Sequence, residues 1–206
     1  MKPLLKALLL LVALMIVIGA IVGSFVLRRG VSARGQPGTL ETFLALRVRA
    51  LAMPRSAREI RNPVQRAPEV IAEGRAHFAD HCAQCHANDG SGNTVMGQGM
   101  WPKVPDMRLP NTQDLTDGEL FYIIENGVRF TGMPGWGTGT ADGELASWHL
   151  VHFIRHLPDL SKPELAEMEM LNPKSPAEIR QQIEEERFLR GERATPPAKP
   201  ATPHRH

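Results

Sequence analysis

The sequence predicts an all-α protein made of an apolar N-terminal helix, a helical domain and a helical arm. No stretch alternates apolar and polar residues as a half-buried strand does. Three capping boxes, each a Ser or Thr followed by Glu three positions later, indicate helix starts at Thr116, Ser161 and Ser175. The 24 Lys and Arg and 22 Asp and Glu residues give a net charge of +2, which is too balanced to indicate a nucleic-acid partner.

The most informative motif is Cys82-Ala83-Gln84-Cys85-His86, a C-x-x-C-H sequence typical of covalent c-type haem attachment. Two thiols on one helical turn can each add across a vinyl group of the same porphyrin. The adjacent imidazole of His86 is placed to bind the iron as the proximal ligand. The motif therefore predicts one haem c, attached through Cys82 and Cys85 and ligated by His86.

Three other interpretations of the cysteine pair fit the sequence less well. A thioredoxin-like redox pair needs a β-α-β context and a thiolate at a helix start, whereas this pair follows a helical stretch. A zinc site usually needs four ligands, and the chain has only two cysteines. A disulfide of such short span would be strained.

Met133 is the predicted sixth iron ligand. It lies in the loop from Thr131 to Gly137, where glycines let the backbone approach the porphyrin and Pro134 stiffens the chain. A thioether is a soft donor that favours ferrous iron, so a His/Met pair raises the reduction potential relative to two imidazoles. The competing ligands are other methionines and histidines of the same region: Met96, Met100, Met107, His149, His152 and His156.

Together, the segment that ends at His86, the Met133 loop and the helix that follows resemble a class I c-type cytochrome of the single-haem, membrane-anchored bacterial kind. The resemblance covers residues 67–160, a length suited to one compact domain. It implies a class I cytochrome c fold around the covalent haem.

In that family a glycine and an aromatic residue on the first helix pack against an aromatic residue on the last. Gly74 and Phe78 match the first pair, and Trp148 is the expected partner. Because Gly74, Phe78 and Cys82 recur every fourth residue, they are expected to share one helix face.

The resemblance also implies that a proline carbonyl accepts a hydrogen bond from the proximal imidazole, which fixes its tautomer. Pro105 is the better match, and Pro102 is the alternative. Trp101 and Trp136 are expected to cover the haem edge or to hydrogen-bond its propionates, and Tyr122 to donate to a propionate.

Local sequence features predict where the helices of this domain begin and end. The first helix should run from about Pro68 to His86, and the second from the Thr116 capping box to Gly127. Asp142 is expected to cap the last helix, which should stop before Pro158.

Residues 1–27 are predicted to form a transmembrane anchor, because Ala7 to Leu27 carry no charge and a spanning helix needs about 20 apolar residues. A cleaved signal peptide is the rival interpretation, but its apolar core is usually shorter and no Ala-x-Ala site follows here. Arg28 and Arg29 after the helix argue against an outside C-terminus. Because the resemblance implies periplasmic haem attachment, we nevertheless expect a single-pass protein of the bacterial inner membrane with a periplasmic haem domain.

Residues 28–66 are predicted to be a juxtamembrane linker, rich in arginine and interrupted by prolines. Within it, Thr39 to Met53 has a helical pattern of apolar residues. This helix is expected to lie on the membrane or on a partner subunit, or to be a plain spacer.

Residues 161–193 are predicted to form an arm of two short helices. The second, from about Ala177 to Arg190, is strongly charged and is either a solvated extension or a docking element. Residues 194–206 are predicted to be a disordered Pro-rich tail, in which His204 and His206 would make only a weak metal site.

These features predict an electron-transfer protein rather than an enzyme, which carries one electron at a time between redox proteins of a respiratory chain. One alternative is a permanent haem subunit of a larger membrane oxidoreductase complex. A haem gas sensor, in which Met133 leaves and CO or NO binds, ranks lower because the sequence has no signalling output domain.

Overall fold

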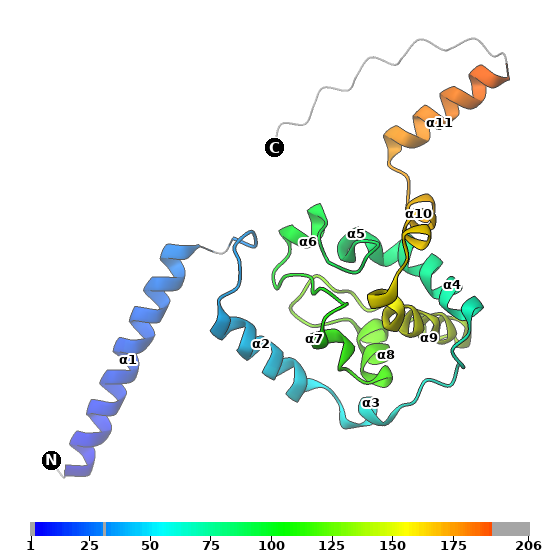
Figure 1. The fold of residues 1–206 in the computed structure, drawn as a ribbon. Helices are drawn as coiled ribbons and strands as arrows, with labels where there is room; N and C mark the ends of the chain where they lie inside the picture. The colour runs from blue at the N-terminus through cyan, green and yellow to red at the C-terminus, as the bar shows by residue number, and fades with distance from the viewer. Residues whose placement is uncertain (1–2, 31, 191–206) are drawn as a thin grey trace.

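The computed structural model describes residues 3–30 and 32–190, which contain helices and no β-strand. An N-terminal helix, α1 (Pro3–Arg29), leads to two strap helices, a helical domain and a projecting helix, α11 (Pro176–Leu189) (Figure 1). The predicted all-α fold class is confirmed. The predicted Pro-rich tail, with His204 and His206, lies outside the described residues.

The strap helices are α2 (Thr39–Ala52) and α3 (Arg55–Glu59). The helical domain comprises the elements that follow them: α4 (Pro68–His77), the π-helical turn η1 (Phe78–Cys82), α5 (Ala83–His86), α6 (Val95–Gly99), α7 (Pro110–Gln113), α8 (Asp117–Asn126), α9 (Ala141–His156), the 3₁₀ turn η2 (Leu157–Asp159) and α10 (Lys162–Leu171).

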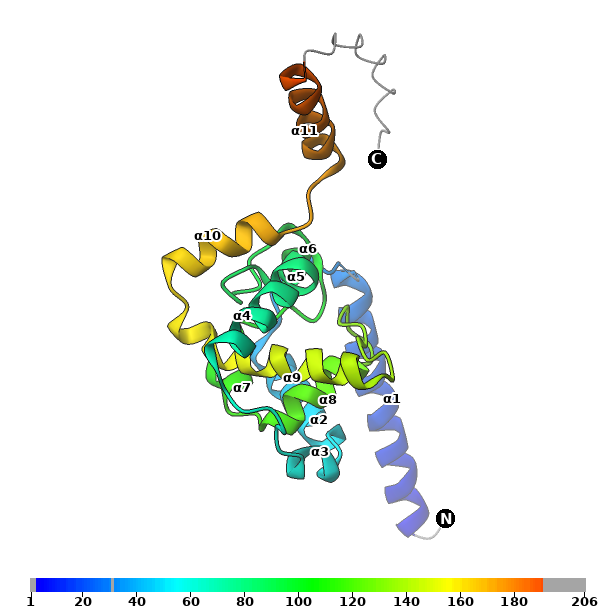
Figure 2. The same ribbon diagram turned by 90° about the vertical axis from the view of Figure 1, so that its right-hand side faces the viewer.

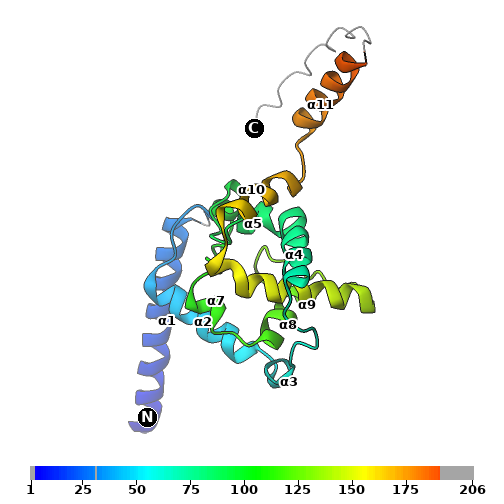
Figure 3. The same ribbon diagram turned by 45° about the vertical axis from the view of Figure 1, so that its right-hand side comes forward.

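The domain is organised around the crossing of α4 and α9, which Figure 3 shows at a steep angle. At the crossing, Gly74 lies against the backbone of α9, since a Cβ atom added to it would lie 2.2 Å from the carbonyl oxygen of His149. One turn after Gly74, at the start of η1, Phe78 packs on Phe153, with ring centroids 5.1 Å apart, and both side chains are almost fully buried. Only a residue without a side chain permits this close backbone approach.

The expected partnership of Trp148 with this glycine and aromatic pair is wrong, because Phe153 takes that place. His149 and Phe153 are four residues apart, so they present one face of α9 to α4. Trp148 is rotated from that face and stacks instead on Phe121 of α8, with ring centroids 4.0 Å apart and planes 8° from parallel. The two aromatic contacts therefore fix α9 against different helices.

The first helix of the domain is helical from Pro68 to His86, as predicted, but it is not a uniform α-helix. At η1 the backbone amide of Ala83 bonds to the carbonyl of Phe78, five residues earlier. A π turn holds more residues than an α turn and is often found at functional sites. It rotates Cys82 and the residues after it relative to an uninterrupted α-helix, a feature that the sequence pattern did not predict.

The starts of α8 and α9 test two of the predicted helix caps. The Thr116 capping box of α8 is present in both directions, and α8 ends at Gly127 as predicted. The cap of α9 is Thr140, not Asp142: Thr140 has an extended backbone and its hydroxyl accepts a hydrogen bond from the Gly143 amide. Asp142 lies inside the first turn, where its charge favours the positive end of the helix dipole.

The first helix of the predicted C-terminal arm, α10, packs on the domain core. Met168 is fully buried and belongs to the same apolar cluster as Phe78 and Phe153. Glu164 accepts hydrogen bonds from Arg75 Nη1 at 2.8 Å and pairs with His156 Nε2 at 2.9 Å. Burial raises the pKa of Glu164, but its bonds with Ser161 and His156 outweigh this effect and lower the pKa to about 2.

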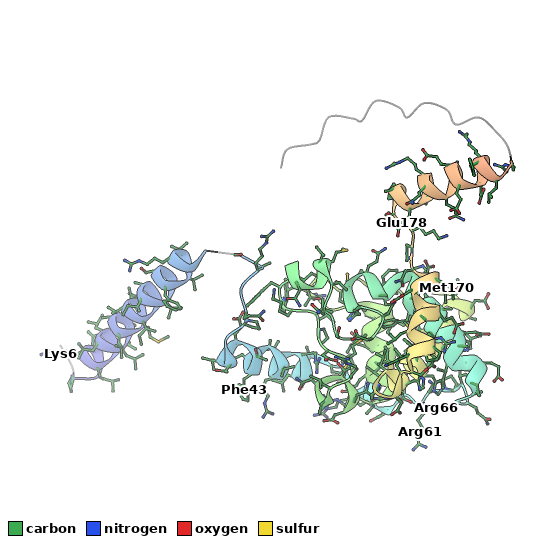
Figure 4. The ribbon with its side chains drawn as sticks, turned by 45° about the horizontal axis from the view of Figure 1, so that its top comes forward. Lys6, Phe43, Arg61, Arg66, Met170 and Glu178 are labelled. Atoms are coloured by element: carbon green, nitrogen blue, oxygen red, sulfur yellow. The ribbon has the colours of Figure 1, made fainter. Side chains whose placement is uncertain are left out.

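The second arm helix, α11, is exposed along its whole length and projects from the domain in two perpendicular views (Figures 1 and 2). Figure 4 labels Glu178 in its first turn, where it completes the predicted capping box with Ser175. The two helices of the arm therefore differ in kind, because only α10 contributes to the core.

We predict that Gly74→Ala destabilises the domain by at least about 3 kcal/mol, because the new methyl group would overlap the α9 backbone. Gly99→Ala is the matched control, since nothing lies within 4 Å of a Cβ there, and its effect should stay within about 1 kcal/mol. Chemical unfolding followed by circular dichroism measures both changes. Equal stabilities of the two variants would contradict the proposed tightness of the crossing.

Two truncations should separate the arm helices. Ending the chain after Leu160 removes the buried Met168 and leaves Arg75 without Glu164, so we expect a loss of about 3 kcal/mol or more. Ending it after Asn172 removes only exposed residues among those described and should leave the unfolding free energy within about 0.5 kcal/mol. Similar losses in both truncations would show that α11 also stabilises the domain.

Candidate functional site

The C-x-x-C-H motif occupies the end of η1 and the short helix α5, directly after the α4 and α9 crossing. Both cysteines are free and half-buried. Helix α5 ends at Ala87, whose φ of 61° lies in the left-handed region, so the chain turns sharply after His86. The two thiols and the imidazole therefore lie within little more than one helical turn, at the point where the chain leaves the helix.

The loop after the motif holds the motif's backbone carbonyls. The amide of Gly92 donates to the carbonyl of His86 at 2.8 Å, and the Thr94 hydroxyl donates to the carbonyl of Cys85 at 3.2 Å. Thr94 also caps α6, because its hydroxyl accepts from the Gly97 amide at 2.9 Å. A Cβ at Gly97 would lie 2.7 Å from the Cys85 carbonyl, so α6 lies directly on the motif.

The imidazole of His86 is in the form that binds metals. Burial lowers the pKa of His86 to about 4, so the ring is neutral at pH 7. Its Nδ1 atom is buried and has no hydrogen-bond partner among the described residues, so the predicted bond from this atom to the carbonyl of Pro105 or Pro102 is not present. The neutral ring fits an iron ligand, because an unprotonated ring nitrogen can coordinate a metal; in the arrangement that the resemblance implies, Nδ1 is the other nitrogen, and it lacks its supporting bond here.

The thiols of the motif are not activated nucleophiles. Burial, and to a smaller extent the neighbouring Cys85, raises the pKa of Cys82 to about 12. Burial also raises the pKa of the Cys85 thiol. A thioredoxin-like pair needs a lowered pKa at a helix start, so this environment argues against that interpretation and leaves covalent attachment as the better use of the pair.

The Met133 loop is fixed to the C-terminal end of α8. The Val128 amide donates to the carbonyl of Met133 at 3.1 Å, and the Trp136 amide donates to the carbonyl of Ile124 at 2.9 Å. Inside the loop, the Thr131 hydroxyl accepts from the Met133 amide at 3.1 Å and donates to the carbonyl of Val128 at 2.7 Å. Met133 itself is half-buried on a firmly held backbone.

The glycines of this region allow close contacts within the protein. A Cβ at Gly127, where φ is 68°, would lie 2.7 Å from the Met133 carbonyl, and a Cβ at Gly135 would lie 2.9 Å from the Glu125 carbonyl. Gly132 faces the Met100 sulfur, which would be 2.8 Å from a Cβ. Approach to the porphyrin was predicted for the glycines of the Met133 loop, among them Gly132 and Gly135. The structure gives a second reason, which is packing of the loop on α8 at Gly135 and on Met100 at Gly132.

The competing ligands differ in their surroundings. Met107 is buried in the apolar cluster, Met96 is half exposed, and Met100 lies beside the Met133 loop. The three histidines of α9 have partners on other elements: His149 pairs with Glu73, His152 Nε2 bonds to the Val64 carbonyl, and His156 pairs with Glu164. Among these residues, Met100 is therefore the strongest alternative to Met133 as the sixth iron ligand, because its sulfur lies beside the Met133 loop.

The remaining predicted pocket residues lie at different depths. Trp101 and Tyr122 are half-buried, and Pro105 is exposed. Trp136 is 37 % exposed and its ring meets the His81 ring edge to face, with centroids 5.6 Å apart. The roles of Thr94 and Thr131 were not predicted. Thr is a favoured N-cap residue, so the cap that Thr94 forms with the Gly97 amide is one that the sequence could have indicated.

The N-terminal helix is the one candidate span among residues 3–30 and 32–190. Within Pro3–Arg28, an 18-residue window has a mean hydropathy of 2.9, and none of that window is buried against the rest of the chain. Length and composition suit a membrane helix, although a signal sequence would share them. No acidic residue lies in its first turn.

Comparison with protein families matches residues 69–154 to the family described as cytochrome c oxidase, cbb3-type, subunit III. Comparison with curated proteins gives no match. The matched residues run from α4 through α9, so they contain the C-x-x-C-H motif, the Met133 loop and the helix crossing at Gly74. This part of the chain is therefore a c-type cytochrome domain, and membership of that family implies haem c binding and electron transfer.

Proposed function

We propose that this chain is a membrane-anchored, single-haem c-type cytochrome that carries one electron at a time between redox proteins. The observation that carries the proposal is the C-x-x-C-H motif, half-buried beside the α4 and α9 crossing within the matched cytochrome domain. The apolar helix α1 supports retention in the bacterial inner membrane. The domain is placed on the periplasmic side because the resemblance to c-type cytochromes implies haem attachment there.

Each residue of the proposed site has a separate task. Cys82 and Cys85 would hold the haem through thioether bonds, and His86 and Met133 would ligate its iron. The haem supplies reversible one-electron chemistry at the iron when bound. The chain supplies a neutral imidazole, a thioether on a fixed loop and an apolar environment, and none of its residues makes or breaks substrate bonds.

The firmness of both ligand segments supports electron transfer over sensing. The carbonyls of Cys85 and His86 are held by the following loop, and the Met133 backbone is bonded to α8. Ligands that do not move between oxidation states keep the reorganisation of the site small. A gas sensor would instead need a sixth ligand that leaves readily.

A second candidate is a permanent haem subunit of a larger membrane oxidoreductase. The observation that favours it is the matched family description, which names a subunit of a cbb3-type cytochrome c oxidase. The exposed helix α11 would then serve as a docking element. Purification from native membranes in mild detergent separates the two candidates, because only a permanent subunit returns with other chains at fixed stoichiometry.

The assignment of Met133 as the sixth iron ligand can be tested by spectroscopy. Ferric wild-type protein should show the near-infrared band of a sulfur–iron bond, and Met133→Ala should lose this band and bind CO when reduced, because the iron is left open. The reduction potential of the variant should fall. Optical spectra with and without CO, together with a redox titration, measure these changes.

Met100→Leu is the matched control for this experiment, because Met100 lies beside the loop and has the same donor atom. It should keep the band and exclude CO. If Met100→Leu loses the band while Met133→Ala keeps it, Met100 is the ligand and the assignment is wrong. If reduced wild-type protein binds CO readily, the electron-carrier proposal gives way to sensing or catalysis.

Thr131 is predicted to position Met133 through its hydroxyl. Thr131→Val removes the acceptor of the Met133 amide and the donor to the Val128 carbonyl, each a bond worth about 1 kcal/mol. The sulfur–iron band should therefore disappear at a lower temperature than in the wild type, while far-ultraviolet dichroism is preserved. Thr131→Ser, which keeps the hydroxyl, should match the wild type; loss in both variants would contradict the role of the hydroxyl.

A further inference from the structure

The strap helix α2 has two faces of unlike chemistry. One face lies toward the domain: Arg49 donates from Nη2 to the carbonyl of Asn111 at 2.9 Å, and Leu46 and Arg49 are half-buried. Met53, one turn after Arg49, is buried. Positions 46, 49 and 53 follow the spacing of a single helix face, so this side of α2 rests on the domain.

The opposite face of α2 is apolar and exposed. Five large side chains at helical spacing have exposed fractions between 51 % and 86 %: Leu40, Phe43, Leu44, Val48 and Leu51. In an ordinary surface helix the apolar stripe faces the core and the polar face is outside, but here the order is reversed. A continuous apolar face of this size indicates an interaction surface.

The strap moves with the domain because it is bonded to α8 and α7. Arg58 Nε pairs with Glu119 at 3.0 Å, and Arg58 Nη2 donates to the carbonyl of Ala50 at 2.7 Å. Ala57 is almost fully buried, and a Cβ at Gly118 would lie 2.1 Å from its carbonyl oxygen. Whatever binds the outer face of α2 therefore also orients the cytochrome domain.

The position of α2 in the chain brings a lipid surface within reach. Helix α1 ends at Arg29 and α2 begins at Thr39, so the residues between them span at most about 30 Å when fully extended. Lys103 also donates from Nζ to the carbonyl of Ala33 at 3.1 Å, which holds this connection against the domain. Figure 4 labels Phe43 on α2, at the end of the helix nearer this connection.

The charge of the segment matches anionic lipid. Residues 28–66 contain nine arginines and two glutamates. Arg47 lies among the exposed apolar residues of α2, with its guanidinium 5.1 Å from the centroid of the Phe43 ring. An arginine that lies along an apolar face can place its charge at headgroup level while its stem stays among apolar groups. Basic and apolar residues together are typical of a helix that lies in a membrane surface.

We propose that α2 lies in the membrane surface with its outer face among lipid chains, and that it thereby holds the cytochrome domain at a fixed tilt to the bilayer. This proposal rests on the proposed function in one respect, the retention of α1 as a membrane anchor. In this arrangement the domain is not a body on a free tether, because the strap restricts which side of the domain meets soluble or membrane partners.

The test uses the full-length haem-loaded protein, reconstituted without other proteins into aligned bilayers of phosphatidylcholine with roughly a third phosphatidylglycerol. Polarised absorption of the haem measures the tilt of its plane to the bilayer. We expect clear dichroism in the wild type and a near-isotropic signal in the double variant Leu44→Asp/Val48→Asp. Both side chains are more than half exposed, so the folded domain should tolerate the change.

The matched control is Ile179→Asp/Ile183→Asp on α11, where two apolar side chains are similarly exposed, and it should keep the wild-type dichroism. Haem absorbance and retention of the protein in salt-washed bilayers are measured in each sample. Loss of wild-type protein from washed bilayers would overturn the anchor itself, whereas retained protein without dichroism would overturn only the strap proposal. Dichroism that appears only in native membranes would show that the outer face binds a protein instead of lipid.

Discussion

The contact between the backbones of α4 and α9 at Gly74 is the constraint on which the rest of the domain depends. It brings the carbonyl of His149 to 2.2 Å from the position of a Cβ, and it places Phe78 on Phe153. The C-x-x-C-H motif begins one turn after Phe78, so its position relative to α9 follows from this contact. A bulkier residue at the crossing would displace the motif as well as the helix.

Two other segments of the chain pack on the helices around this contact. From the C-terminal side, α10 buries Met168 in the same apolar cluster as Phe78 and pairs Glu164 with Arg75 of α4. From the N-terminal side, the strap packs on α8, whose far end holds the Met133 loop. The cytochrome domain and its neighbouring segments are thus packed together as one unit. This arrangement supports a rigid electron-transfer site instead of one in which the iron ligands exchange.

Features encoded by neighbouring residues could be predicted from the sequence. The capping boxes at Thr116, Ser161 and Ser175, the end of α8 at Gly127 and the all-α fold class are of this kind, because each depends on residues within a few positions. The sequence also indicated a cytochrome domain, since the C-x-x-C-H motif is contiguous. The assignment of individual ligands remains a prediction.

Features that depend on the register between distant segments could not be predicted. Phe153 rather than Trp148 meets Phe78 because of how α9 is rotated, and a shift of one residue rotates a helix face by about 100°. The π turn at Phe78, the cap at Thr140 and the burial of Met168 likewise follow from tertiary packing. The apolar pattern of α2 could be predicted from the sequence, but the direction in which its apolar face points could not. That direction follows from the contact of Arg49 with Asn111, which turns the other side of the helix toward the domain.

The most direct test of the account is the intact mass of the purified chain under denaturing conditions, measured with a haem spectrum before and after extraction with acidified acetone. Attachment through Cys82 and Cys85 predicts the mass of the polypeptide plus one haem, with the haem retained after extraction. A haem-free mass, release of the haem into the solvent, or a second haem on the same chain would contradict the account of a single covalently bound haem c.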